Sequence, residues 1–154
     1  MASADEPVIR IAHSQEIDRV AQVWRESALS MDGRMFEISS FREMRDRIER
    51  ELQDEWVLYV AVCGEQIVGM LAIKPRIGVL DQIFVSPSSQ AKGIGKKLLE
   101  TAKAQMPDGF TLNMSARNER ARGFYEKEGL QLVGQSAHPR HGYPVDIYAW
   151  NDSD

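Results

Sequence analysis

The stretch SQAKGIGKKLL, residues 89–99, places two glycines two residues apart, directly before a run of helix-forming residues. Gly93 and Gly95 have no Cβ atom, so the backbone there can bend sharply and a ligand can approach its N–H groups closely. The lysines and leucines that follow favour a helix beginning at this point. Because the N-terminus of a helix attracts anions, the stretch predicts a site for a phosphate-bearing ligand.

Two common nucleotide-binding motifs fit this stretch poorly. A Walker A loop would need glycine at position 90 and serine or threonine at position 97, where the chain has Gln90 and Lys97. A dinucleotide fingerprint would need a small residue at position 98, where the chain has Leu98. A phosphotransferase would therefore lack the hydroxyl that binds Mg²⁺. Taken alone, the stretch could also be a flexible surface turn.

A second stretch, NERARGFYEKEGLQLVG at residues 118–134, follows the first after one expected strand. It combines an asparagine, the sequence Phe-Tyr-Glu, and a glycine followed by an apolar residue. Together with IFVSPSSQAKGIGKKLL, residues 83–99, it resembles the two hallmark motifs of the GNAT superfamily of N-acetyltransferases. The likeness extends over residues 8–150. It implies one α/β domain over residues 1–154, with a mixed central sheet of six to seven strands flanked by about four helices.

The resemblance implies that acetyl-CoA is the acyl donor and that no metal takes part. In the family, backbone groups at the end of the strand before the glycines bind the pantetheine arm as an added strand would. The glycine loop and the helix after it bind the pyrophosphate, with lysines adding positive charge. Carried over to this chain, the cofactor-binding residues are Ile83, Phe84, Val85, Gln90, Ala91, Lys92, Gly93, Ile94, Gly95, Lys96 and Asn118.

Tyr125, in the sequence GFYEK, matches the tyrosine that protonates the departing thiolate of coenzyme A in many members of the family. A phenol with a pKa of ~10 is a reasonable proton donor to a thiolate whose conjugate acid has a pKa near ~8.5. The alternative is a tyrosine that only packs a helix against the sheet. Asn118 is likewise expected to contact the cofactor, to cap its helix, or both.

The general base is less clearly marked. A lysine-type amine with a pKa of ~10.4 costs about 4.6 kcal/mol to deprotonate at pH 7. Relatives carry a glutamate at one of two positions, where this chain has Asn113 and Val79. The nearest acid is Asp81, which strict two-residue alternation places on the same face as Ile83 and Val85. We therefore expect Asp81 to be the base; the alternatives are a carboxylate paired with an arginine, a loop histidine, or a chain of water molecules.

Two loops are expected to contact the acceptor amine, 30–36 and 136–144. The second contains His138, His141 and Tyr143, and either histidine could relay a proton or lie on the surface. Met31, Met35 and Phe36 in the first loop predict an apolar wall or a homodimer contact.

The function that the resemblance implies is direct attack of a primary amine on acetyl-CoA in a ternary complex, the amine belonging to a small molecule or a protein. The alternative is an acyl-CoA-binding module without turnover. Tyr125 separates the two, because a pure binder has no chemical need of it.

Alternating periodicities predict the elements that position these residues. Ser14 is expected to cap the first helix, and Ser40 with Glu43 forms a capping box before the second. The predicted strands are 8–13, 56–62, 66–73, 77–85, 110–116, 130–136 and 145–150, and the predicted helices are 14–30, 41–52, 94–106 and 118–129.

Composition sets outer limits on function. The chain has 154 residues, 43% of them hydrophobic, and a formal net charge of −4. That charge argues against nucleic-acid binding, which needs a basic surface. Cys63 is the only cysteine, so no internal disulfide can form. The start, MASADEPVIR, does not resemble a signal peptide, and no apolar run reaches the ~20 residues of a membrane helix. We therefore expect a cytoplasmic protein without membrane contact.

Overall fold

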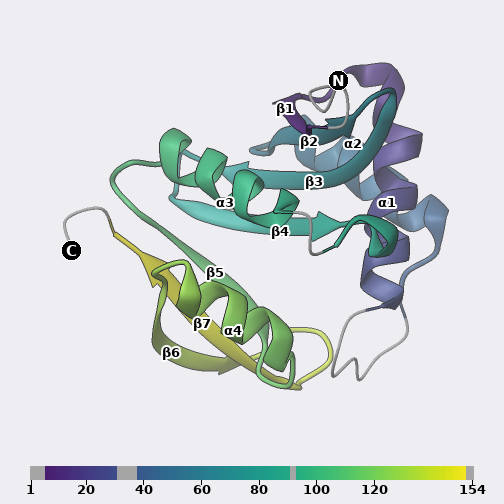
Figure 1. The fold of residues 1–154 in the computed structure, drawn as a ribbon. Helices are drawn as coiled ribbons and strands as arrows, with labels where there is room; N and C mark the ends of the chain where they lie inside the picture. Colours follow the sequence, from purple (N-terminus) through teal and green to yellow (C-terminus); the bar gives the residue numbers. More distant parts are fainter. Residues whose placement is uncertain (1–5, 31–37, 91–92, 152–154) are drawn as a thin grey trace.

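Seven strands form one mixed sheet in the computed structural model, which describes residues 6–30, 38–90 and 93–151 (Figure 1). The strand order is β1-β2-β3-β4-β5-β7-β6. The strands are β1 Val8–Ile11, β2 Val57–Cys63, β3 Gln66–Lys74, β4 Val79–Val85, β5 Phe110–Ser115, β6 Gln131–Ala137 and β7 Pro144–Trp150. The α-helices are α1 Ile17–Leu29, α2 Phe41–Leu52, α3 Ile94–Gln105 and α4 Glu119–Lys127, and two short 3-10 helices are η2 Ser14–Glu16 and η3 Pro87–Ser89. The predicted α/β fold is confirmed.

The sheet consists of two antiparallel parts that meet at one parallel contact. Strands β1 to β4 form a meander, while β7 pairs antiparallel with β5 on one side and β6 on the other. Between the two parts, β4 and β5 are paired at Val79 and Thr111. Figure 1 shows that the two strands lie close at their starts and move apart toward their ends. Parallel pairing that stops after one residue pair leaves backbone N–H and C=O groups on the facing edges available to another partner.

Helices cover both faces of the sheet, and each face has its own core. Residues of β3 alternate between the cores: Met70 and Ala72 pack beneath α1 and α2, while Leu71 and Ile73 pack against α3. The second core continues beneath α4, where it includes Tyr125. None of the helices in the described ranges is long and apolar enough to cross a membrane.

The starts of the first two α-helices test the predicted caps. The capping box of α2 is confirmed, since Ser40 Oγ accepts a hydrogen bond from the Glu43 N–H at 3.1 Å and Glu43 Oε1 accepts one from the Ser40 N–H at 2.9 Å. The predicted cap at Ser14 is wrong. A turn of 3-10 helix comes first, capped at His13, whose N–H donates to Glu16 Oε1 at 2.8 Å, and α1 begins only at Ile17.

Strand β4 contains a bulge at Asp81. The register with β3 passes from the pair Ile73 and Leu80 to the pair Ala72 and Gln82, so Asp81 has no partner across the strands. A bulge inserts one extra residue into a strand, and the side chains beyond it change faces relative to strict alternation.

Candidate active site

A cleft of about 900 Å³ opens where β4 and β5 move apart. One wall comes from α1 and α2, with Trp24 and Arg47, and the other from β5 and α4, with Asn113 and Tyr125. The end of β4 and the start of α3 form the region between these walls, and the loop between β6 and β7 also contributes. Elements distant in sequence therefore surround one space.

The described cofactor-binding candidates gather at this cleft, with one exception. Those that line it are Ile83, Phe84, Val85, Gln90, Gly93, Gly95, Lys96 and Asn118. The exception is Ile94, whose side chain is buried in the core beneath α3. Ala91 and Lys92 lie outside the described residues, as do Met31, Met35 and Phe36 of the first acceptor loop.

The N-terminus of α3 provides a binding place for an anion. Gly93 is its N-cap, with φ of 79°, a conformation that favours glycine, and no side chain caps the helix. The first backbone N–H groups of a helix have no partner within it. A Cβ atom at Gly95 would lie 3.5 Å from Phe124 Cζ and 3.9 Å from Val85 Cγ2, both in residues that line the cleft. The lack of a side chain there keeps this part of the cleft open, so the residues present fit a pyrophosphate.

Two polar residues beside the cleft have structural partners. Asn118 caps α4, because its Oδ1 accepts a hydrogen bond from the Ala121 N–H at 3.2 Å. The Gln90 side chain donates to the carbonyl oxygen of Val85 at 3.2 Å, and the Ser27 hydroxyl lies 2.8 Å from the same oxygen. These contacts hold the end of β4 against α1 and the glycine loop. The predicted capping role of Asn118 is confirmed.

Tyr125 places a neutral hydroxyl at the cleft. The side chain is 7% exposed, its ring lies beside those of Phe124 and Tyr148, and burial raises the pKa of its phenol. No hydrogen bond of this hydroxyl occurs within the described part of the chain. No fully enclosed polar side-chain atom of the described residues lacks a partner, so the Tyr125 oxygen retains some exposed surface, and the residue lines the cleft. By contrast, Tyr148 donates to Glu126 at 2.7 Å, and burial together with this bond raises the pKa of Tyr148 to about 12.

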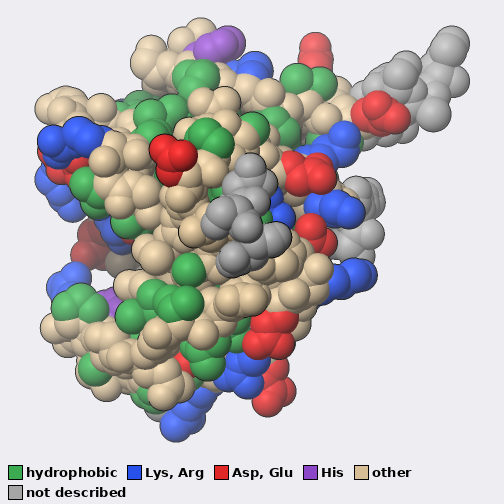
Figure 2. All heavy atoms as spheres, turned by 90° about the vertical axis from the view of Figure 1, so that its left-hand side faces the viewer, with side chains coloured by type: hydrophobic (Ala, Val, Ile, Leu, Met, Phe, Trp, Pro, Cys, Tyr) green, Lys and Arg blue, Asp and Glu red, His purple; other side chains and the backbone are tan. Residues whose placement is uncertain are grey.

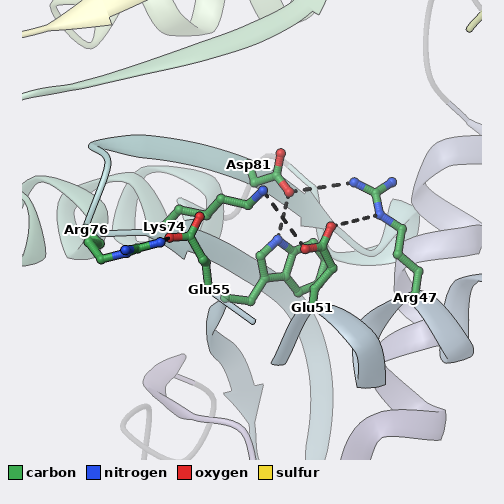
Figure 3. A network of polar contacts seen from close by, with 7 residues as sticks. Arg47, Glu51, Glu55, Lys74, Arg76 and Asp81 are labelled. Carbon is green, nitrogen blue, oxygen red and sulfur yellow. Dashed lines mark hydrogen bonds and ion pairs between the residues drawn. The ribbon is translucent and has the colours of Figure 1, made fainter. Parts of the chain in front are cut away.

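Asp81, in β4, also lines the cleft and is held through one of its two oxygens. Oδ2 accepts a hydrogen bond from Trp56 Nε1 at 2.7 Å and lies 3.6 Å from Arg47 Nη2. Figure 3 shows both contacts on the same oxygen, while the other points away from the network. Arg47 is also 3.5 Å from Glu51, which is 4.0 Å from Lys74.

The predicted orientation of Asp81 is wrong, and the bulge explains the error. Leu80 and Ile83 both pack in the core beneath α3, although they are three residues apart. Asp81 instead contacts Trp56, which belongs to the core beneath α1 and α2, as does Phe84. Asp81 therefore faces the α1 and α2 side of the sheet and not the face of Ile83, while still lining the cleft.

His138, in the loop between β6 and β7, lines the cleft as a neutral ring. Its Nδ1 accepts hydrogen bonds from the backbone N–H groups of Arg140 at 3.2 Å and His141 at 3.1 Å, so its proton is on Nε2. Burial, followed by the nearby charges of His141, Arg140 and Arg47, lowers the pKa of His138. The ring also stacks on Tyr143 at 4.7 Å. This arrangement suits a hydrogen-bond donor better than a base.

The described residues carry mixed surface charge and no metal site. Lys and Arg side chains are interspersed with Asp and Glu side chains on the face that Figure 2 presents. Within residues 6–30, 38–90 and 93–151, no group of three or more His, Cys, Asp or Glu side chains is arranged to hold a metal ion.

Arg47 and Trp56 were not identified from the sequence. Arg47 stands one residue before the buried Ile48 in a highly charged helix, and Trp56 begins an apolar run. Neither has a spacing that indicates contact with Asp81.

Comparison with known proteins identifies the family of this chain. Residues 23–143 match the family model described as an acetyltransferase (GNAT) domain. The peptidyl-lysine N-acetyltransferase YjaB of Salmonella typhimurium is 29% identical over 140 residues, which cover 90% of this chain and 93% of that protein.

Two solved structures share the fold of this chain. The solution structure of apo YjaB from Escherichia coli superposes with a TM-score of 0.69 at 26% identity, covering 94% of this chain and 97% of the other. The PaiA N-acetyltransferase of Thermoplasma acidophilum, solved in complex with coenzyme A, has the same fold with a TM-score of 0.77 at 17% identity, covering 95% and 99% of the two chains. The family predicted from the two sequence motifs is confirmed, and the protein belongs to the GNAT acetyltransferases, which transfer an acetyl group from acetyl-CoA to an amine.

Proposed function

We propose that this enzyme acetylates the side-chain amine of lysine in a protein or peptide, by direct attack of the amine on acetyl-CoA. The observation that carries the proposal is the neutral Tyr125 hydroxyl, which lies at a cleft that Asp81 also lines. A proton donor and a proton acceptor that line one cleft suit a reaction that needs both. Lysine is the first candidate because similar proteins carry the name peptidyl-lysine N-acetyltransferase.

The residues that would hold acetyl-CoA are those at the start of α3 and the end of β4. The N–H groups of the first turn of α3 and the charge of Lys96 suit the pyrophosphate. The open edge of β4, from Ile83 to Val85, suits the amide groups of the pantetheine arm. Acetyl-CoA supplies a thioester whose carbonyl carbon bonds to the amine nitrogen while the bond to sulfur breaks.

Tyr125 holds the proton that the sulfur must receive. Because burial raises the pKa of this phenol, the hydroxyl keeps its proton at neutral pH and can donate it toward a sulfur that gains negative charge. A raised pKa also makes the phenol a weaker acid. Its proton therefore moves only when the charge on the sulfur has developed, which is the stage at which donation accelerates the reaction.

Asp81 takes up the proton that the amine must lose. Its Oδ2 has two partners, so Oδ1 is the oxygen that can accept a proton from an amine in the cleft. His138 is a poor alternative, since Nε2 already carries a proton and Nδ1 accepts two backbone hydrogen bonds. The cost of about 4.6 kcal/mol for a lysine amine at pH 7 makes such an acceptor necessary.

Turnover on matched peptides tests this function. We would measure CoA release with a short peptide containing one lysine and a blocked N-terminus, and with the same peptide carrying arginine in its place. We expect turnover with the first and none with the second, because arginine stays protonated. Spermidine and free amino acids serve as competing acceptors. If the enzyme binds acetyl-CoA but releases CoA with none of these amines, a binding module is the better description.

A further inference from the structure

Asp81 projects from a bulge in β4, where no residue of β3 lies opposite it. Pairing within the sheet therefore does not fix its side chain, and other groups must do so. Two groups converge on its Oδ2: the indole N–H of Trp56 donates a hydrogen bond at 2.7 Å, and the guanidinium of Arg47 forms an ion pair at 3.6 Å. Among the described residues, no donor contacts Oδ1. The carboxylate is thus held at one oxygen only (Figure 3).

Trp56 and Arg47 are themselves held in place. Trp56 is 4% exposed, and its ring centroid lies 5.9 Å from that of Trp24. The guanidinium of Arg47 lies over both indole rings, 5.4 Å from the centroid of Trp24 and 5.9 Å from that of Trp56. Glu51, one helical turn after Arg47, lies 3.5 Å from its Nε. A cation placed over aromatic rings and beside a carboxylate loses most of its rotational freedom.

The charged groups that face Asp81 come from two elements. Arg47 and Glu51 belong to α2, and Lys74, at the end of β3, lies 4.0 Å from Glu51. Arg76 pairs with Glu55 farther along the same network, away from the cleft (Figure 3). Among the described residues, Trp56 is the one neutral hydrogen-bond donor to the Asp81 carboxylate.

We propose that Trp56 and Arg47 are positioning residues for the acetyl-transfer reaction: they hold Oδ2 of Asp81 and direct Oδ1 into the cleft toward the acceptor amine. The inference rests on the proposed function of Asp81 as proton acceptor. We call the contacts of Trp56 and Arg47 with Oδ2 the clamp. Without the clamp, the carboxylate would turn about its side-chain bonds, and Oδ1 would be correctly placed for the amine only part of the time. The clamp acts on the acceptor side and leaves the binding of acetyl-CoA alone.

A double-mutant cycle tests the clamp. Trp56→Phe keeps an aromatic ring and removes the N–H that Asp81 accepts, while Trp150→Phe makes the same change at an indole that packs on Phe110 and does not line the cleft. We expect Trp56→Phe to lower kcat about tenfold, with the Kd for acetyl-CoA unchanged. In the background of Asp81→Asn, the same change should lower kcat no further, because the oxygen it directs is no longer a proton acceptor.

A purely structural role for Trp56 would give a different pattern. Trp56→Phe would then lower kcat equally in the parent and in Asp81→Asn, or would match Trp150→Phe, and either result overturns the proposal. If Trp56→Phe destabilises the core, Arg47→Gln reaches the clamp from the helix surface, with the exposed Arg50→Gln as its control. We expect Arg47→Gln to change kcat at least threefold in the parent and not in Asp81→Asn, whereas equal changes in both would overturn the clamp.

Failure of the proposed function would give results different from failure of the clamp alone. If Asp81→Asn keeps the parental kcat at every pH, Asp81 is not the proton acceptor and the clamp has no role in catalysis. If the parent itself acetylates none of the amines, the enzyme assignment fails before the cycle is measured.

Discussion

Tyr125 combines burial with access to the cleft, and these two properties have opposite effects on its chemistry. Burial raises the pKa of the phenol, so the hydroxyl keeps its proton, while its position at the cleft allows it to donate that proton to a bound molecule. Tyr148, the neighbouring ring, is fully buried and gives its hydrogen bond to Glu126. The hydroxyl of Tyr148 is therefore structural, whereas the hydroxyl of Tyr125 remains available to a ligand in the cleft.

Replacing Tyr125 by phenylalanine removes this proton and keeps the ring. We expect kcat to fall on the order of 10²- to 10⁴-fold, the usual contribution of a general acid, while the Kd for acetyl-CoA changes less than about threefold. Tyr148→Phe is the matched control, since it removes a hydroxyl from the adjacent ring without reaching the cleft. Steady-state CoA release and an acetyl-CoA titration measure the two quantities. If the Tyr125→Phe variant turns over at the parental rate, Tyr125 has only a packing role.

At the residue scale, sequence could indicate which types of side chain do the chemistry, but not how they are held. Tyr125 and the glycines were recognisable because they stand in motifs of fixed spacing. The direction of Asp81 was wrong because nothing in VLDQIFV indicates a bulge, whose position depends on the pairing with β3. Arg47 and Trp56 are 34 and 25 residues from Asp81 in sequence, and contacts between such distant residues arise only from the fold.

The start of α3 shows how one element serves both the fold and the ligand. Gly93 has positive φ, where any other residue is strained, whereas Gly95 does not, and a Cβ there would make ordinary van der Waals contacts with Phe124 and Val85. The two glycines therefore serve different needs: Gly93 the turn of the backbone, and Gly95 the free space beside the expected ligand.

Replacing each glycine by alanine should distinguish the backbone role of Gly93 from the ligand-space role of Gly95. We expect Gly93→Ala to lower the stability of the free protein by about 1 kcal/mol, because of its left-handed conformation. Gly95→Ala should leave the stability unchanged or raise it by about 0.5 kcal/mol, as alanine favours a helix, and yet weaken acetyl-CoA binding. Urea unfolding and ligand titration give both values. Parental affinity in Gly95→Ala would mean that the pyrophosphate does not approach this part of α3.

The junction of β1 and α1 depends on an ion pair. Arg10 donates to both carboxylate oxygens of Glu16, at 2.9 and 2.7 Å, and these bonds are the main reason that the pKa of Glu16 falls from 4.5 to about 2. A carboxyl group with a lowered pKa in the folded state stabilises the fold fully above its unfolded pKa. This contribution is lost as the pH falls from about 4.5 toward 2.

Glu16→Gln removes the charge and keeps an oxygen for the N–H of His13. We expect the variant to be about 1 kcal/mol less stable than the parent at pH 7, and this difference to shrink steadily below pH 4.5. Urea unfolding of both proteins at several pH values measures the difference. If it stays constant down to pH 3, the cap and not the charge is what stabilises the junction.

Among the elements, those with a strong periodicity or a cap signal were predictable. The helix with the capping box was expected over 41–52 and is found at those residues. The first helix was expected to begin at Ser14, but a 3-10 turn replaces its start because Glu16, paired with Arg10, accepts the His13 N–H. Local spacing does not reveal a partner on the preceding strand.

In the whole molecule, acetyl-CoA is expected to lie between the two parts of the sheet and to bind only when both are folded. A ligand of this kind stabilises the native state by about 2.7 kcal/mol at a hundredfold excess over its Kd. We therefore expect acetyl-CoA to raise Tm by several degrees, and ATP and NAD at the same concentration to leave it unchanged. Thermal unfolding with each ligand is the measurement. Equal effects of all three would contradict the assigned cofactor.

The single parallel contact between Val79 and Thr111 also has a consequence for folding. Residues 110–150 pair among themselves through β5, β7 and β6, and the strands β1 to β4 likewise pair with their neighbours in sequence. Each part of the sheet can thus form its local contacts early in folding, and the docking of the two parts is the later step that brings distant residues together. The amide hydrogens of the later part should then exchange with solvent through a partial opening that leaves the first part intact. A molecule bound across the gap closes that route, so the bound substrate should slow amide exchange in residues far from the groups that it contacts.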